Sequence, residues 1–463
     1  MNRFIGDRKF YRKVLTVTFP IMIQNGVTNF VGMLDNIMVG RIGTDQMSGV
    51  AIVNQLFFVF NICIFGALAG AGILGAQYYG KADYEGIRHV FRFKIICAAV
   101  MVALGLVILG GFGGQLISLY LHEGSAGNLE DTWIYGSQYL QIMLWGLLPF
   151  AVVQTYSSTL REAGETVMPM IASVCAVGVN LVLNYILIFG RFGAPVMGVR
   201  GAAVATVISR LVELSIIVIW THTHSVRMPF AAGVYRSLYI PGAVIRQTVR
   251  VGLPLLVNEA LWSCGMAVMT QFYSVRGLEV VAGLNISNTI SNVFNVVYIA
   301  MGTGTGIILG QLLGAGKVDQ AKDEDRKMIV FAVVLCAALG VGLFLLAPLF
   351  PRIYNTEEEV RQLATGLIRV TAVFMPVYGF YNCAYFTLRA GGKTGITFLF
   401  DSGILWAVSI PLLFCLIYFT SLSVLPVFIL VQSVDIFRSI LGIALLRKGI
   451  WARTIVVGTK QVA

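Results

Sequence analysis

The chain has 463 residues, of which 57% are hydrophobic and only 12% are charged. Soluble domains carry about 25% charged residues, and no hydrophilic stretch in this chain is long enough to form such a domain. The net charge of +11 is spread over separate loops, which argues against a nucleic-acid-binding face. We therefore predict an all-α polytopic membrane protein.

Twelve apolar segments are each long enough to cross about 30 Å of hydrocarbon as a helix. In chain order they are 14–38, 47–79, 93–118, 134–158, 166–190, 201–221, 251–275, 282–314, 329–350, 365–388, 395–418 and 424–446. The second and eighth segments are unusually long, so a re-entrant or surface portion is expected in each of them.

Lys and Arg gather in alternate loops, which fixes the expected orientation. The basic loops include Arg3, Arg8, Lys9, Arg12 and Lys13 at the start, Lys81, Arg88, Arg92 and Lys94 after the second segment, and Arg447, Lys448 and Arg453 near the end. Two of the intervening loops, 122–131 and 355–360, are acidic. This positive-inside pattern predicts a multi-pass protein of the plasma (inner) membrane with both termini in the cytoplasm.

The chain contains an internal repeat with an offset of 234 residues. Pro20 falls on Pro254, and Gln77 on Gln311. Each half holds an even number of segments, so the repeat is parallel, as in transporters built from two bundles related by an axis along the membrane normal. We predict two six-helix bundles with a parallel pseudo-two-fold relation: an N-terminal lobe over 1–221, a cytoplasmic linker over 222–250 and a C-terminal lobe over 251–463.

The stretch "GAGILG" at 70–75 matches the glycine fingerprint of dinucleotide-binding proteins. That fingerprint requires a strand before it and a helix after it, whereas this stretch and its repeat mate at 302–310 lie inside apolar segments. We interpret both as places where helix backbones approach closely, or where a helix breaks, and not as a nucleotide site.

Few ionisable residues lie at membrane depth. Four of them form two pairs of opposite charge, in which the members are three residues apart and therefore lie on one helix face. Within each pair the two side chains can neutralise each other. The pairs are Arg210 with Glu213, and Asp435 with Arg438. We predict that both are structural ion pairs. Asp401 lies near the cytoplasmic end of its segment, from where its side chain could reach the headgroups, and we assign it no function.

Asp35 and Glu259 have no charged partner in the sequence around them. An unpaired carboxylate inside a membrane is a functional-site hypothesis by default. A carboxyl group in such surroundings can hold a proton, a Na⁺ ion or a cationic substrate in exchange for one another. The alternative is a buried acid that is protonated and hydrogen-bonded for structural reasons.

Polar and aromatic residues accompany these acids. Asn180 and Asn184 lie four residues apart on one face of the fifth segment, where their amide oxygens can bind Na⁺ or their nitrogens a carboxylate. Further candidates for contact with a flat cation in a substrate cavity are Met33, Asn54, Phe57, Tyr273, Asn288, Asn292, Tyr298, Met301, Tyr378 and Tyr381. Core packing or lipid contact is the alternative for each of them.

The sequence "MLDNIMVGRIG" in the first segment, the related turns "LREAGET" (160–166) and "LRAGGKT" (388–394), the repeat and the fifth-segment asparagines together resemble the MATE (multidrug and toxic compound extrusion) family over essentially the whole chain. The resemblance implies a V-shaped pair of six-helix lobes that exports organic, often cationic compounds in exchange for H⁺ or Na⁺.

Carried over residue by residue, the resemblance makes Asp35 the cation-coupling acid of the first lobe, or the Na⁺ ligand if the ion is sodium, and Asn180 the amide beside it. Asn184 stands where many members have a second Asp, and Glu259 resembles the seventh-helix Glu of one branch. The tenth-helix Asp of that branch is replaced near Tyr378.

We therefore expect a cation-coupled antiporter without a cofactor, working by alternating access on small organic molecules, as a monomer and without a nucleic-acid partner. A lipid-linked saccharide flippase of the same superfamily is the alternative within transport. A channel stays open as a third possibility. An enzyme is not expected, since no nucleophile or metal cluster lies at depth.

Overall fold

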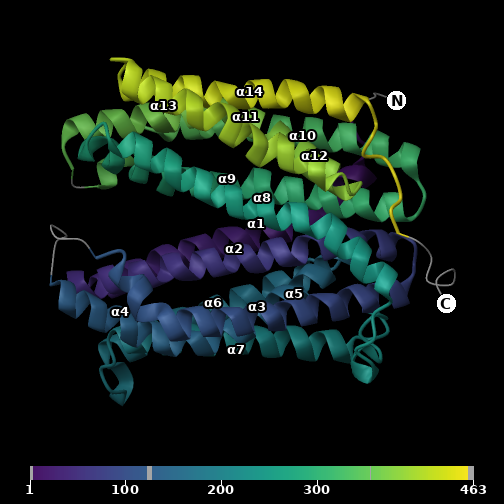
Figure 1. Ribbon diagram of the computed structural model, residues 1–463, viewed down its shortest axis with the longest axis horizontal. Coiled ribbons are helices and arrows are strands. Elements are labelled where there is room, and N and C mark those ends of the chain that lie inside the picture. Colours follow the sequence, from purple (N-terminus) through teal and green to yellow (C-terminus); the bar gives the residue numbers. More distant parts are fainter. Residues whose placement is uncertain (1–3, 122–127, 355, 457–463) are drawn as a thin grey trace.

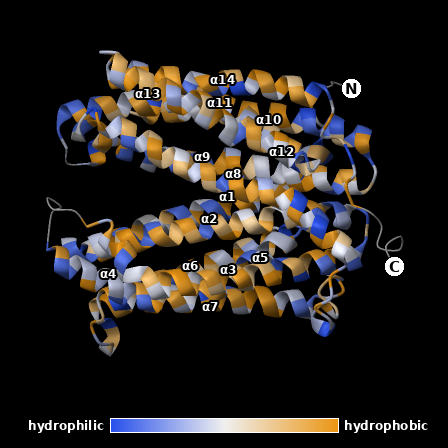
Figure 2. Cartoon of the chain, viewed as in Figure 1, coloured by the Kyte–Doolittle hydropathy of each residue, from blue (hydrophilic) through white to orange (hydrophobic). Residues whose placement is uncertain are grey.

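The computed structural model describes residues 4–121, 128–354 and 356–456, and within these ranges the regular structure is entirely helical. Twelve helices in the described chain are long and apolar enough to cross a membrane, which confirms the predicted number. Apolar residues cover the middle of the helices and hydrophilic residues gather at their two ends (Figure 2).

The first six spans are α1 (Arg8–Gly40), α2 (Thr44–Gly80), α3 (Tyr84–Ser118), α4 and α5 (Leu129–Met143 and Leu147–Glu162, joined by the turn η1, Leu144–Gly146), α6 (Val167–Phe189) and α7 (Val199–Thr223). The other six are α8 (Gly242–Ser274), α9 (Leu278–Gly314), α10 (Val318–Leu346), α11 (Glu358–Ala390), α12 with α13 (Thr394–Phe398 and Ile410–Phe419) and α14 (Val424–Arg447). Like η1, three further short turns are 3₁₀-helical: η2 (Arg191–Gly193), η3 (Val234–Arg236) and η4 (Pro351–Ile353).

Both long apolar segments form single unbroken helices, α2 and α9, of 37 residues each. Of the two alternatives, the re-entrant portion is therefore wrong. At about 1.5 Å per residue such a helix measures roughly 55 Å, so its ends extend well beyond the hydrocarbon on one or both sides. The span made by α12 and α13 is less regular, because two π-helical turns, η5 (Leu399–Gly403) and η6 (Leu405–Ser409), lie within it.

Two groups of helices form two lobes, one from α2 to α7 and one from α9 to α14 (Figure 1). The lobes lie together at the end that carries both termini, and they diverge toward the opposite end. The first helix of each half begins against the other lobe. Phe10 and Val14 of α1 share a core cluster with residues of α9, α10 and α11, whereas Val251 and Leu255 of α8 pack on Ile73 of α2.

The glycine-rich stretches allow close contacts between helices of the two halves of the chain. A Cβ atom on Gly70 would lie 2.2 Å from the Cα atom of Gly252 in α8, and one on Gly310 would lie 2.9 Å from the Cβ atom of Ala76. The predicted role in helix approach is therefore confirmed, and both stretches continue as helix.

Two glutamines related by the repeat join the lobes at the end that carries the termini. Gln77 of α2 donates from Nε2 to the carbonyl oxygen of Ala390 at the end of α11 (2.8 Å), and Gln311 of α9 donates to the carbonyl oxygen of Glu162 at the end of α5 (2.8 Å). Each accepting carbonyl belongs to one of the two related turns, so the clasp follows the pseudo-two-fold axis. We call these two hydrogen bonds the glutamine clasp.

The segment after α14 crosses the same end of the molecule. The backbone nitrogen of Ile455 donates to Gln77 Oε1 at 2.8 Å, and Arg453 Nε donates to the carbonyl oxygen of Gly391 at 3.0 Å. Trp451 is buried in the cluster shared by α1 and the second lobe. This segment therefore contacts both lobes and adds to the closure of this end.

Lys94 of α3 is fully buried and is not the solvated loop residue that the charge pattern suggested. Its Nζ atom lies 2.6 Å from Glu162 Oε1 and also contacts the hydroxyl groups of Ser158 and Thr159. The Glu162 carboxylate fills the space beside Gly72 and Gly75 of α2, where a Cβ atom would lie within 2.6 Å of its oxygens. The ion pair thus holds in place the end of α5, where the Glu162 carbonyl oxygen accepts the hydrogen bond of Gln311 in the glutamine clasp.

Replacing Lys94 by Met is expected to lower the free energy of unfolding by about 3–5 kcal/mol, because the change leaves a buried carboxylate without its partner. Denaturant unfolding of the purified protein in detergent measures the loss. As a control, Lys327→Met removes the partner of the half-exposed Asp323 and should cost about 0.3–0.5 kcal/mol. The double variant Lys94→Met/Glu162→Met should recover most of the stability. Equal losses in Lys94→Met and the control would contradict this assignment.

Candidate functional site

Asp35 lies on α1 against two amides of α6. Asn184 donates from Nδ2 to Asp35 Oδ1 at 2.6 Å and also contacts Asn180 Oδ1 at 3.1 Å. One orientation of the Asn180 amide donates to Thr206 Oγ1 at 3.3 Å, and the other places its nitrogen 3.0 Å from Asp35 Oδ1. The spacing of four residues on one helix face, read from the sequence, brings both amides to this single carboxylate.

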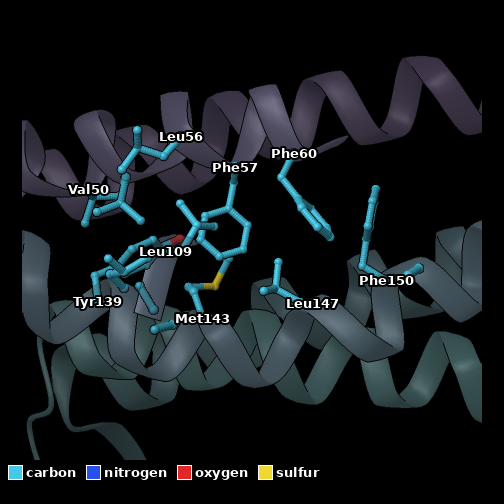
Figure 3. Close-up of a cluster of buried hydrophobic side chains, with 14 of the residues drawn as sticks. Val50, Leu56, Phe57, Phe60, Leu109, Tyr139, Met143, Leu147 and Phe150 are labelled. Atoms are coloured by element: carbon cyan, nitrogen blue, oxygen red, sulfur yellow. The ribbon is translucent and has the colours of Figure 1, made fainter. Parts of the chain in front are cut away.

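A cavity of about 330 Å³ opens beside Asp35, between α1 and the helices of the first lobe. Its walls come from α1, α2, the α4–η1–α5 span, α6 and α7, and include Asn54, Phe57, Phe58, Phe60, Tyr139, Met143, Phe150, Thr206 and Arg210. Figure 3 shows Phe57 and Phe60 of α2 pointing toward Tyr139, Met143, Leu147 and Phe150. The cavity therefore has an aromatic floor with a carboxylate and an arginine on its walls.

Arg210 lines this cavity and also forms one of the two predicted ion pairs. Its Nη1 atom lies 3.0 Å from Glu213 Oε2, and its guanidinium lies 5.2 Å from the centre of the Phe150 ring. Sequence spacing identified the pair but not its place at the cavity, because the burial of α7 against α5 decides which face turns inward. Tyr139 of α4 and Thr206 of α7 were missed because the packing of these helices, which the sequence does not show, decides which of their residues face the cavity.

Asn184 has a further feature that suits cation binding. Its Oδ1 atom is buried and accepts no hydrogen bond in the described part of the chain. An unsatisfied buried acceptor is costly, and a proton on Asp35 or a small cation at this position would provide a partner. The residues present therefore fit a proton or a small cation at Asp35, with the Asn184 oxygen as a nearby acceptor that has no other partner.

The second lobe contains a separate polar cluster around Asp401. This residue is buried at 5% exposure, so its side chain does not reach the headgroups, as its place near the end of the segment had allowed. Asn258 of α8 donates to its Oδ2 atom at 2.9 Å, and the Tyr381 hydroxyl donates to Oδ1. Asp401 lies in η5, and π-helical turns often occur at functional positions.

Arg438 joins both acids of this cluster. Its Nη1 atom lies 3.1 Å from Asp435 Oδ1, as the spacing predicted, and 3.9 Å from Asp401 Oδ1. The guanidinium also lies 4.9 Å from the centre of the Tyr381 ring. One arginine therefore balances two carboxylates, and the sequence showed only one of the two contacts.

Glu259 has a partner that its sequence neighbourhood did not reveal. Arg389 Nη1, in the turn at the end of α11, lies 4.0 Å from Glu259 Oε1, and the Tyr385 hydroxyl donates to the same oxygen at 3.5 Å. The interpretation of Glu259 as an unpaired acid is therefore corrected, since residues 130 positions apart in sequence meet only in the folded lobe.

The residues predicted to line a substrate cavity lie in several different parts of the structure. Asn54 and Phe57 line the first-lobe cavity. Tyr273 and Met301 belong to buried core clusters, whereas Asn288 and Asn292 are exposed on α9. Tyr298 and Tyr378 pack against each other with ring centres 5.7 Å apart. The side chain of Met33 lies outside the described part of the structure.

The two lobes, the parallel repeat and the cavity at an intramembrane carboxylate define a bilobed membrane transporter. The MatE family model matches residues 20–186 and 254–423, so the two matches begin 234 residues apart, since 254 − 20 = 234. The chain belongs to the MatE family of membrane transporters and is not an enzyme.

Individual relatives agree with this assignment. The chain is 24% identical over 452 residues to "Probable multidrug resistance protein NorM" of Thermotoga maritima, covering 97% of this chain and 95% of that protein. It is 24% identical to "Probable multidrug resistance protein YoeA" of Bacillus subtilis, covering 90% and 89%. Its fold is similar, with a TM-score of 0.84 and 20% identity over 97% of each chain, to a solved outward-facing multidrug resistance MATE family transporter.

Proposed function

We propose that this protein is a multidrug efflux transporter of the inner membrane that exchanges organic cations or amphiphiles for H⁺ or Na⁺, with Asp35 as the coupling group. The observation that carries the proposal is the position of Asp35. It contacts amides of α6 on one side and borders the aromatic cavity on the other. A coupling ion and a substrate would therefore meet at one carboxylate.

The exchange follows from the chemistry of that carboxylate. An ionised Asp35 accepts the hydrogen bonds of the α6 amides and attracts a cation in the cavity. When it takes up a proton, it loses its charge and becomes a donor as well as an acceptor, which weakens its hold on a cationic substrate and changes its contact with α6. Substrate release toward the open end of the lobes then follows proton or Na⁺ binding.

The shape and charge of the cavity suit a small organic molecule. Its volume of about 330 Å³ falls within the usual range of about 300–1,000 Å³ for ligand pockets, and its aromatic rings provide faces for cation–π contact. The arginine in its wall is paired with Glu213. Because Glu213 neutralises Arg210, the cavity is not strongly cationic, as the cavity of a lipid-linked saccharide flippase is expected to be.

The test uses the purified protein in proteoliposomes that contain ethidium, with an imposed pH or Na⁺ gradient. Efflux that follows one gradient, and stops when an ionophore collapses it, supports antiport and identifies the ion. Ethidium movement that is independent of every gradient would instead indicate a channel. If no cation tested moves while a lipid-linked saccharide does, the flippase is the correct function.

A further inference from the structure

A second cavity lies outside the first-lobe site, between the first turns of α3 and the linker that joins the two halves. It measures about 300 Å³ and is lined by Glu85, Arg88, Arg92, Ala232, Gly233 and Arg236. Three arginines face one glutamate, which gives a formal charge of +2. In the described part of the chain, none of the three arginines lies within 4.0 Å of a carboxylate oxygen.

Two of these arginines are held in place by backbone carbonyls of the linker. Arg92 is buried and donates to the carbonyl oxygens of Val234 (2.8 Å) and Tyr239 (3.2 Å). Arg88 donates from Nη2 to the carbonyl oxygen of Pro229 at 3.0 Å, and its Nε atom is buried without a hydrogen-bond partner. The guanidinium groups are thus fixed before any ligand binds, which reduces the entropy lost on binding, and they keep free donors.

The position of the cavity along α3 matches the headgroup layer. The apolar segment predicted from the sequence begins near residue 93, so Arg92 lies at the edge of the hydrocarbon and Arg88 lies about 8 Å beyond it, at 1.5 Å per residue. The polar layer of a bilayer extends about 5–8 Å on each side of the hydrocarbon. A group held between these arginines therefore lies at the depth of lipid phosphates.

The linker beside the cavity presents apolar and aromatic side chains. Tyr235, Leu238 and Tyr239 are 54%, 61% and 69% exposed. Aromatic residues of this kind gather at the level of the headgroups, so this part of the linker is suited to contact with acyl chains. This feature favours a lipid over a soluble anion as the source of the bound group.

We propose that this cavity, which we name the α3–linker cavity, binds the phosphate group of an anionic lipid. The guanidinium groups of Arg88, Arg92 and Arg236 provide the donors, since arginine matches phosphate oxygens with a planar set of N–H groups. The Glu85 carboxylate repels additional negative charge. The cavity therefore prefers a lipid with one phosphodiester charge and an otherwise neutral headgroup. The bound lipid joins α3 of the first lobe to the linker that leads into α8.

Native mass spectrometry of the full chain tests this assignment. The protein is titrated in detergent with phosphatidylglycerol, phosphatidylcholine or inorganic phosphate. Wild type is expected to retain one phosphatidylglycerol with a preference of tenfold or more over phosphatidylcholine. Arg236→Gln should weaken this binding about fivefold, the usual effect of one basic residue on an anionic lipid, and Arg88→Gln/Arg236→Gln should weaken it further.

Arg246→Gln is the matched control, because Arg246 is exposed on α8 and does not line the cavity. It should bind phosphatidylglycerol as wild type does. The side chain of Arg236 is exposed and makes no hydrogen bond or ion pair within the described part of the chain, so its variant remains informative if the double variant does not fold. Equal binding of phosphatidylcholine, or unchanged binding by Arg236→Gln, would overturn the proposal. Binding of inorganic phosphate without phosphatidylglycerol would replace the lipid by a soluble anion and overturn it as well.

Discussion

Asp35→Asn is expected to remove gradient-driven efflux of ethidium completely, while the protein still folds. The amide is nearly the same size as the carboxyl group but cannot bind a proton or hold a Na⁺ ion by charge. The substitution also replaces one carboxylate oxygen, which accepts hydrogen bonds, by an NH₂ group, which donates them. This weakens the contact with Asn184 Nδ2, which lies 2.6 Å from Asp35 Oδ1 in the structure. Both the coupling ion and the attraction for a cation in the cavity are therefore lost.

The size of the effect follows from the gradient. For one-for-one exchange with protons, a pH difference of one unit supports about a tenfold ratio of substrate across the membrane, because a tenfold ratio corresponds to about 1.4 kcal/mol. The variant should show a ratio of about one under the same gradient. Efflux from proteoliposomes, measured by ethidium fluorescence together with the thermal stability of the purified protein, separates lost coupling from lost folding.

Asp319→Asn is the matched control, since Asp319 is exposed at the start of α10 and does not line the cavity. It should transport as wild type does. Gradient-driven efflux that persists in Asp35→Asn but disappears in Asp401→Asn would place the coupling group in the second lobe. That result would contradict the role of Asp35 and leave the fold assignment unaffected.

The second large effect is expected from Gly80→Ala and Gly314→Ala at the closed end of the molecule. A Cβ atom on Gly80 would lie 1.8 Å from the carbonyl oxygen of Gln311, and one on Gly314 would lie 1.9 Å from that of Gln77. Contacts of a Cβ atom below 3.0 Å essentially do not occur. The lobes must therefore separate locally by at least 1.2 Å (3.0 − 1.8), which also lengthens the hydrogen bonds of the glutamine clasp.

Such overpacking costs about 1–3 kcal/mol, and a difference of that size changes a two-state equilibrium by about 5- to 150-fold. We expect the population to move toward a state in which the end carrying the termini is open. Spin labels at Lys81 and Lys317, both exposed beside the contact, report the change as a longer distance in a background without the seven native cysteines.

Gly178→Ala and Gly342→Ala are suitable controls. Both glycines are helical, and a Cβ atom on either would have no neighbour within 4 Å. These controls should leave the distance between the labels unchanged, and alanine should slightly stabilise their helices. If Gly80→Ala and Gly314→Ala also left the distance unchanged, the contact would not hold the two lobes together.

Much of this protein was determined by the sequence alone. The length and number of apolar segments predicted the twelve spans, because a helix must cover a fixed thickness of hydrocarbon. The 234-residue repeat predicted the two lobes, and the spacing of Asn180 and Asn184 predicted that they share one helix face. These features depend on local spacing or on membrane dimensions, both of which are visible in a linear sequence. That these amides accompany Asp35 was implied by the family resemblance and not by the spacing.

Only the tertiary structure decided which distant groups meet. Glu259 contacts Arg389, Asp401 is buried against Asn258 and Arg438, and Lys94 is paired with Glu162. In each case the partners come from helices that are far apart in the chain, and their contact depends on the rotation and tilt with which those helices pack. Because burial of the apolar faces sets that rotation, the sequence identified the charged residues at depth but not all of their partners.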